Sequence, residues 1–265
     1  MNLQLEGKTA FISGSTAGIG RAIAAALARE GARVIVNGRT QQAVTETVAA
    51  LHREPGAGAE AQGFAGDLST EAAADALARR HPDVTIVVNN YGIFEVQPFE
   101  KIADADWRRF FEANVLSGVR LARLYLPVMR QHNWGRIIFI SSESGIQIPA
   151  EMVHYGMTKA AQIAVARGLA ESLAGTGITV NSVLPGPTRS RGLGDFAAKL
   201  SAEEGKSFEE FEAEFFSKFR PTSLLKRFIT PEEVASLVAY IASPLASATT
   251  GSALRVDGGV VRSAF

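Results

Sequence analysis

The chain has 265 residues, 46% of them hydrophobic and 20% charged, an ordinary composition for a globular protein large enough to form one α/β domain. Because Lys plus Arg and Asp plus Glu balance at 27 each, the charge indicates no surface for nucleic acid or an anionic membrane, and no apolar run is long enough to span a membrane. The absence of cysteine excludes disulfides, thiolate catalysis and cysteine-ligated metal, and the four histidines show no metal-ligand spacing, so no metal site is expected. The N-terminus lacks a secretory signal, so we expect a cytoplasmic protein.

Strand-like and helix-like segments alternate along the first part of the chain. Apolar runs at 9–13, 33–37, 62–65 and 84–88 are expected to be strands. Helices are expected from the glycine loop after the first run to Gly31, from Thr40 to about Leu51, and over 69–80.

The second part of the chain continues this alternation. Further helices are expected to run from Asp104 to about Gln131, after Ala150, and from Thr230. Further strands are expected at 136–140, 178–184 and 252–256. Because continuous apolar strands alternate with helices, the pattern predicts an α/β fold with a parallel sheet covered on both faces, in a single domain of residues 1–265.

Tyr155 and Lys159 lie four residues apart in the stretch His-Tyr-Gly-Met-Thr-Lys. If this stretch is helical, both side chains leave the same face one turn apart. A fixed ammonium beside a phenol favours the phenolate, so such a pair supports general acid/base chemistry near neutral pH. On its own, the pair is equally compatible with a surface tyrosine lying against a lysine stem.

A glycine loop lies between the first expected strand and the first expected helix. Residues 13–20 read Ser-Gly-Ser-Thr-Ala-Gly-Ile-Gly, with glycines at 14, 18 and 20. Glycines allow a tight turn and a close backbone approach, and the N-terminus of the following helix offers its free amides to a pyrophosphate. The loop therefore indicates dinucleotide binding, against the alternative of a purely structural turn.

Together these motifs resemble the short-chain dehydrogenase/reductase family over nearly the whole chain. The family's G-x-x-x-G-x-G spacing is found at Gly14, Gly18 and Gly20, and Tyr155 follows Ser142 by the usual thirteen residues. Four further stretches match in the expected order, although Tyr91 replaces the usual alanine in the second of them: Asp67-Leu68, Asn89-Asn-Tyr-Gly92, Pro185-Gly-Pro-Thr188 and Val256-Asp-Gly-Gly259. The resemblance implies a Rossmann-type, doubly wound, parallel seven-stranded sheet of order 3-2-1-4-5-6-7 in a three-layer sandwich.

The resemblance also assigns roles to residues. Tyr155 would exchange a proton with a substrate oxygen, Lys159 would lower the pKa of Tyr155 and bind the nicotinamide ribose, and Ser142 would hold the substrate oxygen. Asn114 would position a water that links Lys159 to solvent. The expected cofactor-binding residues are Gly14, Ser15, Thr16, Gly18, Ile19, Gly20, Arg39, Asp67, Leu68, Asn89, Gly92, Tyr155, Lys159, Pro185, Gly186 and Thr188.

The cofactor expected from the end of the second strand is NADP(H), with NAD(H) possible. Relatives that prefer NAD usually carry an acid where Gly38 stands, and the following Arg39 fits a 2′-phosphate through its bidentate guanidinium. The alternative is that Arg39 only stacks on adenine, and Ala17 weakens the NADP interpretation because many NADP relatives carry a second basic residue in the loop.

The substrate is expected to be a ketone or secondary alcohol. The general layout resembles the family's 3-oxoacyl-ACP reductases. The segment 189–226 should cover the active site, with an amphipathic helix over about 207–218 that either closes on the ligand or packs on the core or on another subunit. Four apolar residues near Ser142 suggest a mostly apolar pocket, which favours a moderately hydrophobic ketone over a sugar: Ile146, Ile148, Met152 and Val153.

Alternative functions and the assembly were also considered. The alternatives are an NAD-dependent alcohol dehydrogenase of the same family, an epimerase or dehydratase on the same scaffold, and a non-catalytic dinucleotide sensor. The glycine spacing and chain length count against an epimerase, and the presence of Ser142, Tyr155 and Lys159 counts against a sensor. By resemblance we expect a homotetramer.

Overall fold

The computed structural model describes residues 2–54, 60–189 and 207–264. Its centre is a sheet of seven parallel strands in the order β3-β2-β1-β4-β5-β6-β7, as expected. The strands are β1 Thr9–Ile12, β2 Arg33–Gly38, β3 Ala61–Ala65, β4 Ile86–Asn89, β5 Gly135–Ile140, β6 Ile178–Pro185 and β7 Ala253–Val256. The apolar runs that form β1, β4 and β5 are buried central strands, whose two faces are both covered, and β3 and β7 form the partly exposed edges of the sheet.

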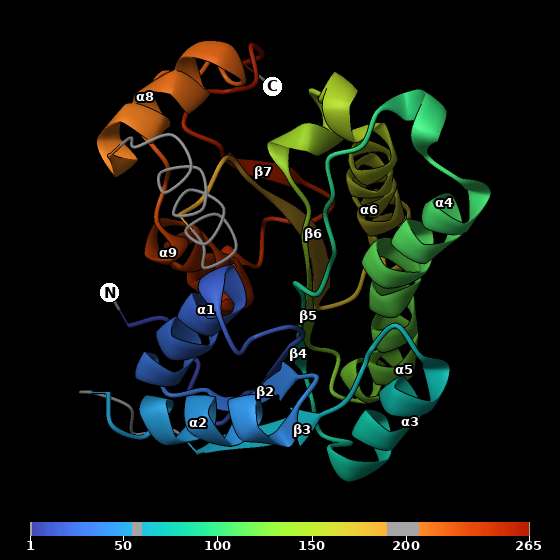
Figure 1. Ribbon diagram of the computed structural model, residues 1–265. Coiled ribbons are helices and arrows are strands. Elements are labelled where there is room, and N and C mark those ends of the chain that lie inside the picture. The colour runs from blue at the N-terminus through green and yellow to red at the C-terminus, as the bar shows by residue number, and fades with distance from the viewer. Residues whose placement is uncertain (1, 55–59, 190–206, 265) are drawn as a thin grey trace.

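Helices lie on both faces of the sheet (Figure 1). On one face are α1 Gly18–Arg29, α2 Gln41–Leu51 and α9 Pro231–Ala242; on the other are α3 Glu71–Arg80, α5 Ser117–Gln131 and α6 Val153–Ser172. Successive strand residues point to opposite faces, so in β1 Ile12 joins the core beneath α1 and α9, whereas Phe11 joins the core beneath α3, α5 and α6. The result is the three-layer sandwich that the resemblance implied.

The long helix expected from Asp104 to Gln131 is interrupted. It consists of α4 Asp104–Phe111, a π-helical turn η2 Glu112–Leu116 and α5. Asn114 lies in this turn, where its Oδ1 accepts the Ile93 N–H at 2.7 Å and its Nδ2 donates to the Ile93 carbonyl at 3.0 Å. The wider turn directs the Asn114 side chain at the segment after β4, and such turns often mark functional sites.

The segment expected to cover the site is described in part. Helix α8 Phe208–Lys218 begins at a capping box, in which Ser207 and Glu210 bond each other's backbone amides. Its phenylalanines pack with Phe228 into a small separate core: Phe208, Phe211, Phe215 and Phe216. Residues 190–206 of the expected segment lie outside the described residues. Among the helices that the structure describes, none is long and apolar enough to cross a membrane.

Candidate active site

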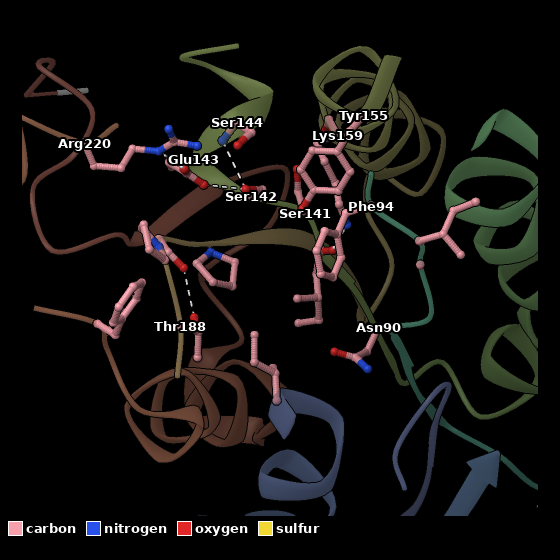
Figure 2. Close-up of a pocket in the computed structure, with 18 of the residues that line it drawn as sticks. Asn90, Phe94, Ser141, Ser142, Glu143, Ser144, Tyr155, Lys159, Thr188 and Arg220 are labelled. Atoms are coloured by element: carbon pink, nitrogen blue, oxygen red, sulfur yellow. Dashed lines mark hydrogen bonds and ion pairs between the residues drawn. The ribbon is translucent and has the colours of Figure 1, made fainter. Parts of the chain in front are cut away.

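A cavity of about 320 Å³ lies at the carboxyl ends of the strands, the edge where open parallel sheets bind ligands (Figure 2). Its described lining includes eight of the residues expected at the site: Ile19, Gly92, Ser142, Tyr155, Lys159, Pro185, Gly186 and Thr188. The other ten expected residues are not part of that lining: Gly14, Ser15, Thr16, Gly18, Gly20, Arg39, Asp67, Leu68, Asn89 and Asn114. The structure thus brings together three of the four expected catalytic side chains, without Asn114, and the segments that follow β4 and β6.

Lys159 lies on α6 one turn after Tyr155, so both side chains face the cavity from the same side of the helix. The Lys159 ammonium donates to the Ile140 carbonyl at 2.9 Å and to Gln162 Oε1 at 3.1 Å, and it lies 5.5 Å from the centre of the Tyr155 ring. Burial lowers the pKa of Lys159 to about 8, because the charged form loses its hydration, and the Glu143 carboxylate opposes this shift.

The pKa of Tyr155 departs from the expectation based on the Tyr-Lys spacing. Burial of the phenol raises its pKa above the ordinary value of 10, the Glu143 carboxylate raises it further, and a hydrogen bond with Ser142 and the charge of Arg220 oppose the rise. The expected lowering by Lys159 is not found in the chain alone, since the ammonium bonds Ile140 and Gln162 and lies over the ring of Tyr155. The phenol of Tyr155 is therefore protonated at neutral pH in this state.

A glutamine links Asn114 to Lys159. The Asn114 carbonyl accepts from Gln162 Nε2 at 2.6 Å, and the Oε1 of the same Gln162 accepts from Lys159. The side chain of Gln162 therefore connects Asn114 to Lys159 directly. Sequence reasoning missed Gln162, although its position three residues after Lys159 places both on one helical face.

Sequence reasoning also missed an ion pair in the cavity wall. Glu143 follows Ser142 directly and is 4% exposed. Its Oε2 accepts from the Ser142 hydroxyl at 2.5 Å, and its Oε1 accepts from Arg220 Nε at 3.0 Å (Figure 2). Arg220 lies two residues beyond α8, so the pair connects the covering segment to the loop that holds Ser142. The two partners are 77 residues apart, and no local pattern links them.

The glycine loop has the shape that a dinucleotide needs. Gly14 and Gly18 have φ values of +61° and +54°, a region that residues with a side chain rarely adopt. A Cβ on Gly20 would lie 2.5 Å from the Gly14 carbonyl oxygen, so this close approach excludes any side chain. The loop leads directly into the N-terminus of α1, whose first amides have no partner within the helix. These residues fit the pyrophosphate of a nicotinamide dinucleotide.

Two residues beside the loop brace it. Ser15 is buried, where its hydroxyl donates to the Ile12 carbonyl at 2.7 Å and accepts the Asn37 N–H at 2.9 Å. Asn90 lines the cavity and donates to the carbonyls of Ser13 and Gly14, both at 3.0 Å. Of the pair Asn89-Asn90, the residue that reaches the cavity is therefore Asn90, whereas the expected Asn89 is buried at the end of β4.

The region expected to hold the adenosine lies at the ends of β2 and β3. Arg39 and Asp67 are exposed there. Leu68 is only 1% exposed and belongs to the core, so it is not accessible to a cofactor in this structure. Tyr91 is partly buried nearby: burial and the charge of Asp67 raise its pKa, and Arg39 opposes that rise. The bulky residue that departs from the family pattern thus lies beside the two charged residues.

The substrate side of the cavity combines a charged pair with apolar side chains. Its described lining includes Glu143, Ser144 and Arg220, with Phe215 and Phe228 from the covering segment. The four residues expected to make the pocket apolar do not line it: Ile146, Ile148, Met152 and Val153. Ile146 and Ile148 are 46% and 48% exposed. The choice of these four residues was therefore wrong, and the apolar part of the lining comes from other segments.

Comparisons with known proteins agree with this arrangement. The sequence model of a family described as Enoyl-(Acyl carrier protein) reductase matches residues 14–261. The Bacillus subtilis (strain 168) protein named "Uncharacterized oxidoreductase YvaG" is 48% identical over 265 residues, which are 100% of each chain. The 3-oxoacyl-[acyl-carrier-protein] reductase FabG of Aquifex aeolicus (strain VF5) is 33% identical, over 98% of this chain and 100% of that protein.

Among solved structures, L-sorbose reductase from Gluconobacter frateurii, complexed with NADPH and L-sorbose, superposes with a TM-score of 0.93. It is 30% identical, over 99% of this chain and 100% of that one. The matches span the whole fold, including the strands, the glycine loop and the helix of Tyr155 and Lys159. The chain therefore belongs to the short-chain dehydrogenase/reductase family, and it is an oxidoreductase acting on CH–OH and C=O groups.

Proposed function

We propose that this chain interconverts a ketone and a secondary alcohol with NADP(H), or less efficiently NAD(H), and that Tyr155 is the general acid and base. The observation that carries the proposal is the convergence of Ser142, Tyr155 and Lys159 on one cavity beside the glycine loop. The relative with bound NADPH and L-sorbose supports the same class of reaction. When bound, the dinucleotide supplies or accepts the hydride, and the chain supplies position and proton transfer.

In this proposal the residues of the chain have distinct tasks. Tyr155 gives its phenolic proton to the carbonyl oxygen during reduction and takes it back from the alcohol during oxidation. Lys159, fixed by Ile140 and Gln162, holds a positive charge beside the phenol and faces the ribose of the cofactor. Ser142 lies next to Tyr155, and its oxygen accepts a hydrogen bond from the hydroxyl of the alcohol, which holds that oxygen in place.

The preference for NADP(H) rests on the end of β2. A Cβ on Gly38 would lie 2.5 Å from Cγ2 of Thr16, so this position does not accommodate an acidic side chain without movement. Arg39 follows and is exposed, so its guanidinium is accessible to a 2′-phosphate. We further propose that residues 1–265 form a single domain, that four copies of the chain form a homotetramer, and that the protein acts in the cytoplasm. Light scattering of the purified protein tests the assembly.

The experiment that tests this function measures the oxidation of NADPH and NADH with a panel of ketones, diketones and 3-oxoacyl thioesters. Turnover that prefers NADPH and is lost in Tyr155→Phe is expected. The matched control is Tyr240→Phe, because Tyr240 lies exposed on α9 outside the described cavity lining. Tight cofactor binding without turnover of any ketone or alcohol would favour the alternative of a dinucleotide sensor. A sensor would not need Ser142, Tyr155 and Lys159 for catalysis.

A further inference from the structure

Glu143 is a buried carboxylate in the cavity that the proposed mechanism does not use. It is 4% exposed, and its two oxygens accept from the Ser142 hydroxyl and from Arg220 Nε. Burying an ionised carboxylate is costly unless charge and hydrogen bonds compensate, and here Arg220 provides the charge. The chain thus maintains a negative charge directly beside the serine that faces the substrate.

The hydrogen bonds of Ser142 determine what the cavity wall offers to a substrate. A serine hydroxyl has one hydrogen, and that of Ser142 is directed to Glu143 Oε2 at 2.5 Å. The Ser142 oxygen accepts the Ser144 N–H at 3.1 Å and hydrogen-bonds with Tyr155. In this arrangement Tyr155 alone donates to the reacting oxygen, while the oxygens of Ser142 and Glu143 can only accept hydrogen bonds. A substrate that bonds to these oxygens must therefore carry a donor, such as a hydroxyl group, of its own.

The charges nearby indicate that this substrate is neutral. Arg220 is the guanidinium in the described lining, and besides Glu143 it contacts Glu151, with 3.5 Å between Nη1 and Oε1. Its Nη1 also donates to the Phe219 carbonyl at 2.8 Å. One guanidinium is therefore shared by two carboxylates, so Arg220 has little charge left to bind an acidic substrate group. A carboxylate has about four acceptor sites, so Glu143 retains capacity for a substrate hydroxyl.

We propose that Glu143 is a specificity-determining residue, whose carboxylate accepts a hydrogen bond from a hydroxyl on the carbon next to the reacting carbonyl. The preferred substrates are then neutral α-hydroxy ketones, and the corresponding vicinal diols in the reverse direction. In reduction, the hydride of the reduced dinucleotide forms a C–H bond at the carbonyl carbon, and the proton of Tyr155 forms the new O–H bond. The neighbouring hydroxyl keeps its proton throughout, the dinucleotide is oxidised, and Tyr155 regains a proton from solvent. This inference rests on the proposed function.

The test compares matched ketones with NADPH: 2-butanone with 1-hydroxy-2-butanone, and cyclohexanone with 2-hydroxycyclohexanone. The readout is the ratio of kcat/KM for the hydroxylated ketone to that for the plain one. We expect a ratio of at least about tenfold in the wild type, because a hydrogen bond to a charged acceptor is worth at least that much in an equilibrium constant. Glu143→Ala should bring the ratio close to one, whatever its effect on the absolute kcat/KM for the plain ketones.

Two further variants separate specificity from structure. Glu143→Gln keeps the size of the side chain and one acceptor oxygen, so its ratio should lie between those of the wild type and Glu143→Ala. Glu151→Gln removes the other carboxylate that contacts Arg220 but lies outside the described lining, so it should keep the wild-type ratio. If Glu143 had only a structural role, its replacement would lower kcat/KM for both ketones of each pair equally and leave the ratio unchanged.

The outcomes are distinguishable. Equal use of hydroxylated and plain ketones by the wild type, or a ratio that survives in both Glu143 variants, would overturn the inference and leave the proposed function standing. Failure of the wild type to turn over any ketone in either direction would overturn the proposed function, and the inference with it. The wild-type ratio is measured without any substitution, so a variant that fails to fold does not remove the test.

Discussion

Replacing Gln162 with leucine removes the connection between Asn114 and Lys159. Gln162 is 1% exposed, and leucine has nearly its volume, so the substitution deletes two hydrogen bonds without opening a cavity. The Asn114 carbonyl in the π-helical turn loses its amide donor, which should cost about 1–3 kcal/mol of stability. The Lys159 ammonium keeps only the Ile140 carbonyl among its described acceptors.

The lost acceptor should change the titration of Lys159. A hydrogen bond to a charged group is worth about 1.5–3 kcal/mol, and about 1.4 kcal/mol corresponds to one pKa unit. Burial already lowers the pKa of Lys159 to about 8, so Gln162→Leu should lower it by about one further unit. The basic limb of the pH profile for ketone reduction should then move to lower pH by about that amount.

The assay is the pH profile of kcat/KM for ketone reduction, with thermal unfolding as the check on the fold. Gln162→Glu keeps an acceptor for Lys159 and adds a negative charge, so its basic limb should move to higher pH. Gln131→Leu makes the same substitution at an exposed position on α5 and should leave the profile unchanged. A folded Gln162→Leu enzyme with the wild-type profile would refute this account of Lys159.

Three further predictions concern the other groups of the site. Burial lowers the pKa of Lys159 from 10.5 to about 8, so between pH 8 and pH 10.5 the unfolded chain binds more protons than the folded one. The free energy of unfolding of the wild type, relative to that of Lys159→Met, should therefore rise by about 2 kcal/mol from pH 8 to pH 10. Urea unfolding measures this difference, and a difference that stays constant with pH would contradict the prediction. Gly92→Ala places a Cβ 3.1 Å from Asn114 Oδ1 and 3.8 Å from Lys159 Nζ, so both side chains should move slightly. The kcat/KM should then fall by about tenfold or more, while the circular dichroism spectrum stays native. An unchanged rate would show that Asn114 needs no fixed position. Arg39→Ser should lower kcat/KM with NADPH by about tenfold and leave that with NADH nearly unchanged, whereas equal losses with both cofactors would remove Arg39 from the recognition of the 2′-phosphate.

The parallel sheet follows from features that are local in the sequence. The runs Ala10-Phe-Ile12 and Ile86-Val-Val88 are apolar and continuous, so they fit strands that are covered on both faces. The helix starts at Thr40 and Thr230 are also local features, because the side chain of each threonine accepts a hydrogen bond from the backbone amide three residues later. Patterns of this kind depend on neighbours within a few residues and can be read directly.

The interruption at Asn114 could not be predicted in this way. A π-helical turn adds one residue to a helix, and the apolar residues on either side, Phe110 and Leu121, remain buried as in a continuous helix. The cause of the turn is the contact of Asn114 with the backbone of Ile93, which is 21 residues away. A contact at this distance leaves no periodic signal in the sequence.

The polar wall of the cavity was missed for a similar reason. The expected apolar pocket relied on residues close to Ser142 in the sequence, yet Ile146 and Ile148 do not line the described cavity. The wall is made instead by Glu143 and a guanidinium from a distant segment. A glutamate directly after Ser142 was visible in the sequence, but its burial and its ion pair with Arg220 were not.

The measurement that tests the central claim most directly follows the hydride itself. NADPH carrying deuterium at both C4 positions of the nicotinamide is incubated with a ketone and either the wild type or Tyr155→Phe. The mass of the product alcohol is then measured by mass spectrometry. The account predicts deuterium on the carbinol carbon with the wild type, and a rate at least about a hundredfold lower with Tyr155→Phe. Alcohol formed without deuterium when both C4 positions are labelled, or formed equally fast by Tyr155→Phe, would contradict it.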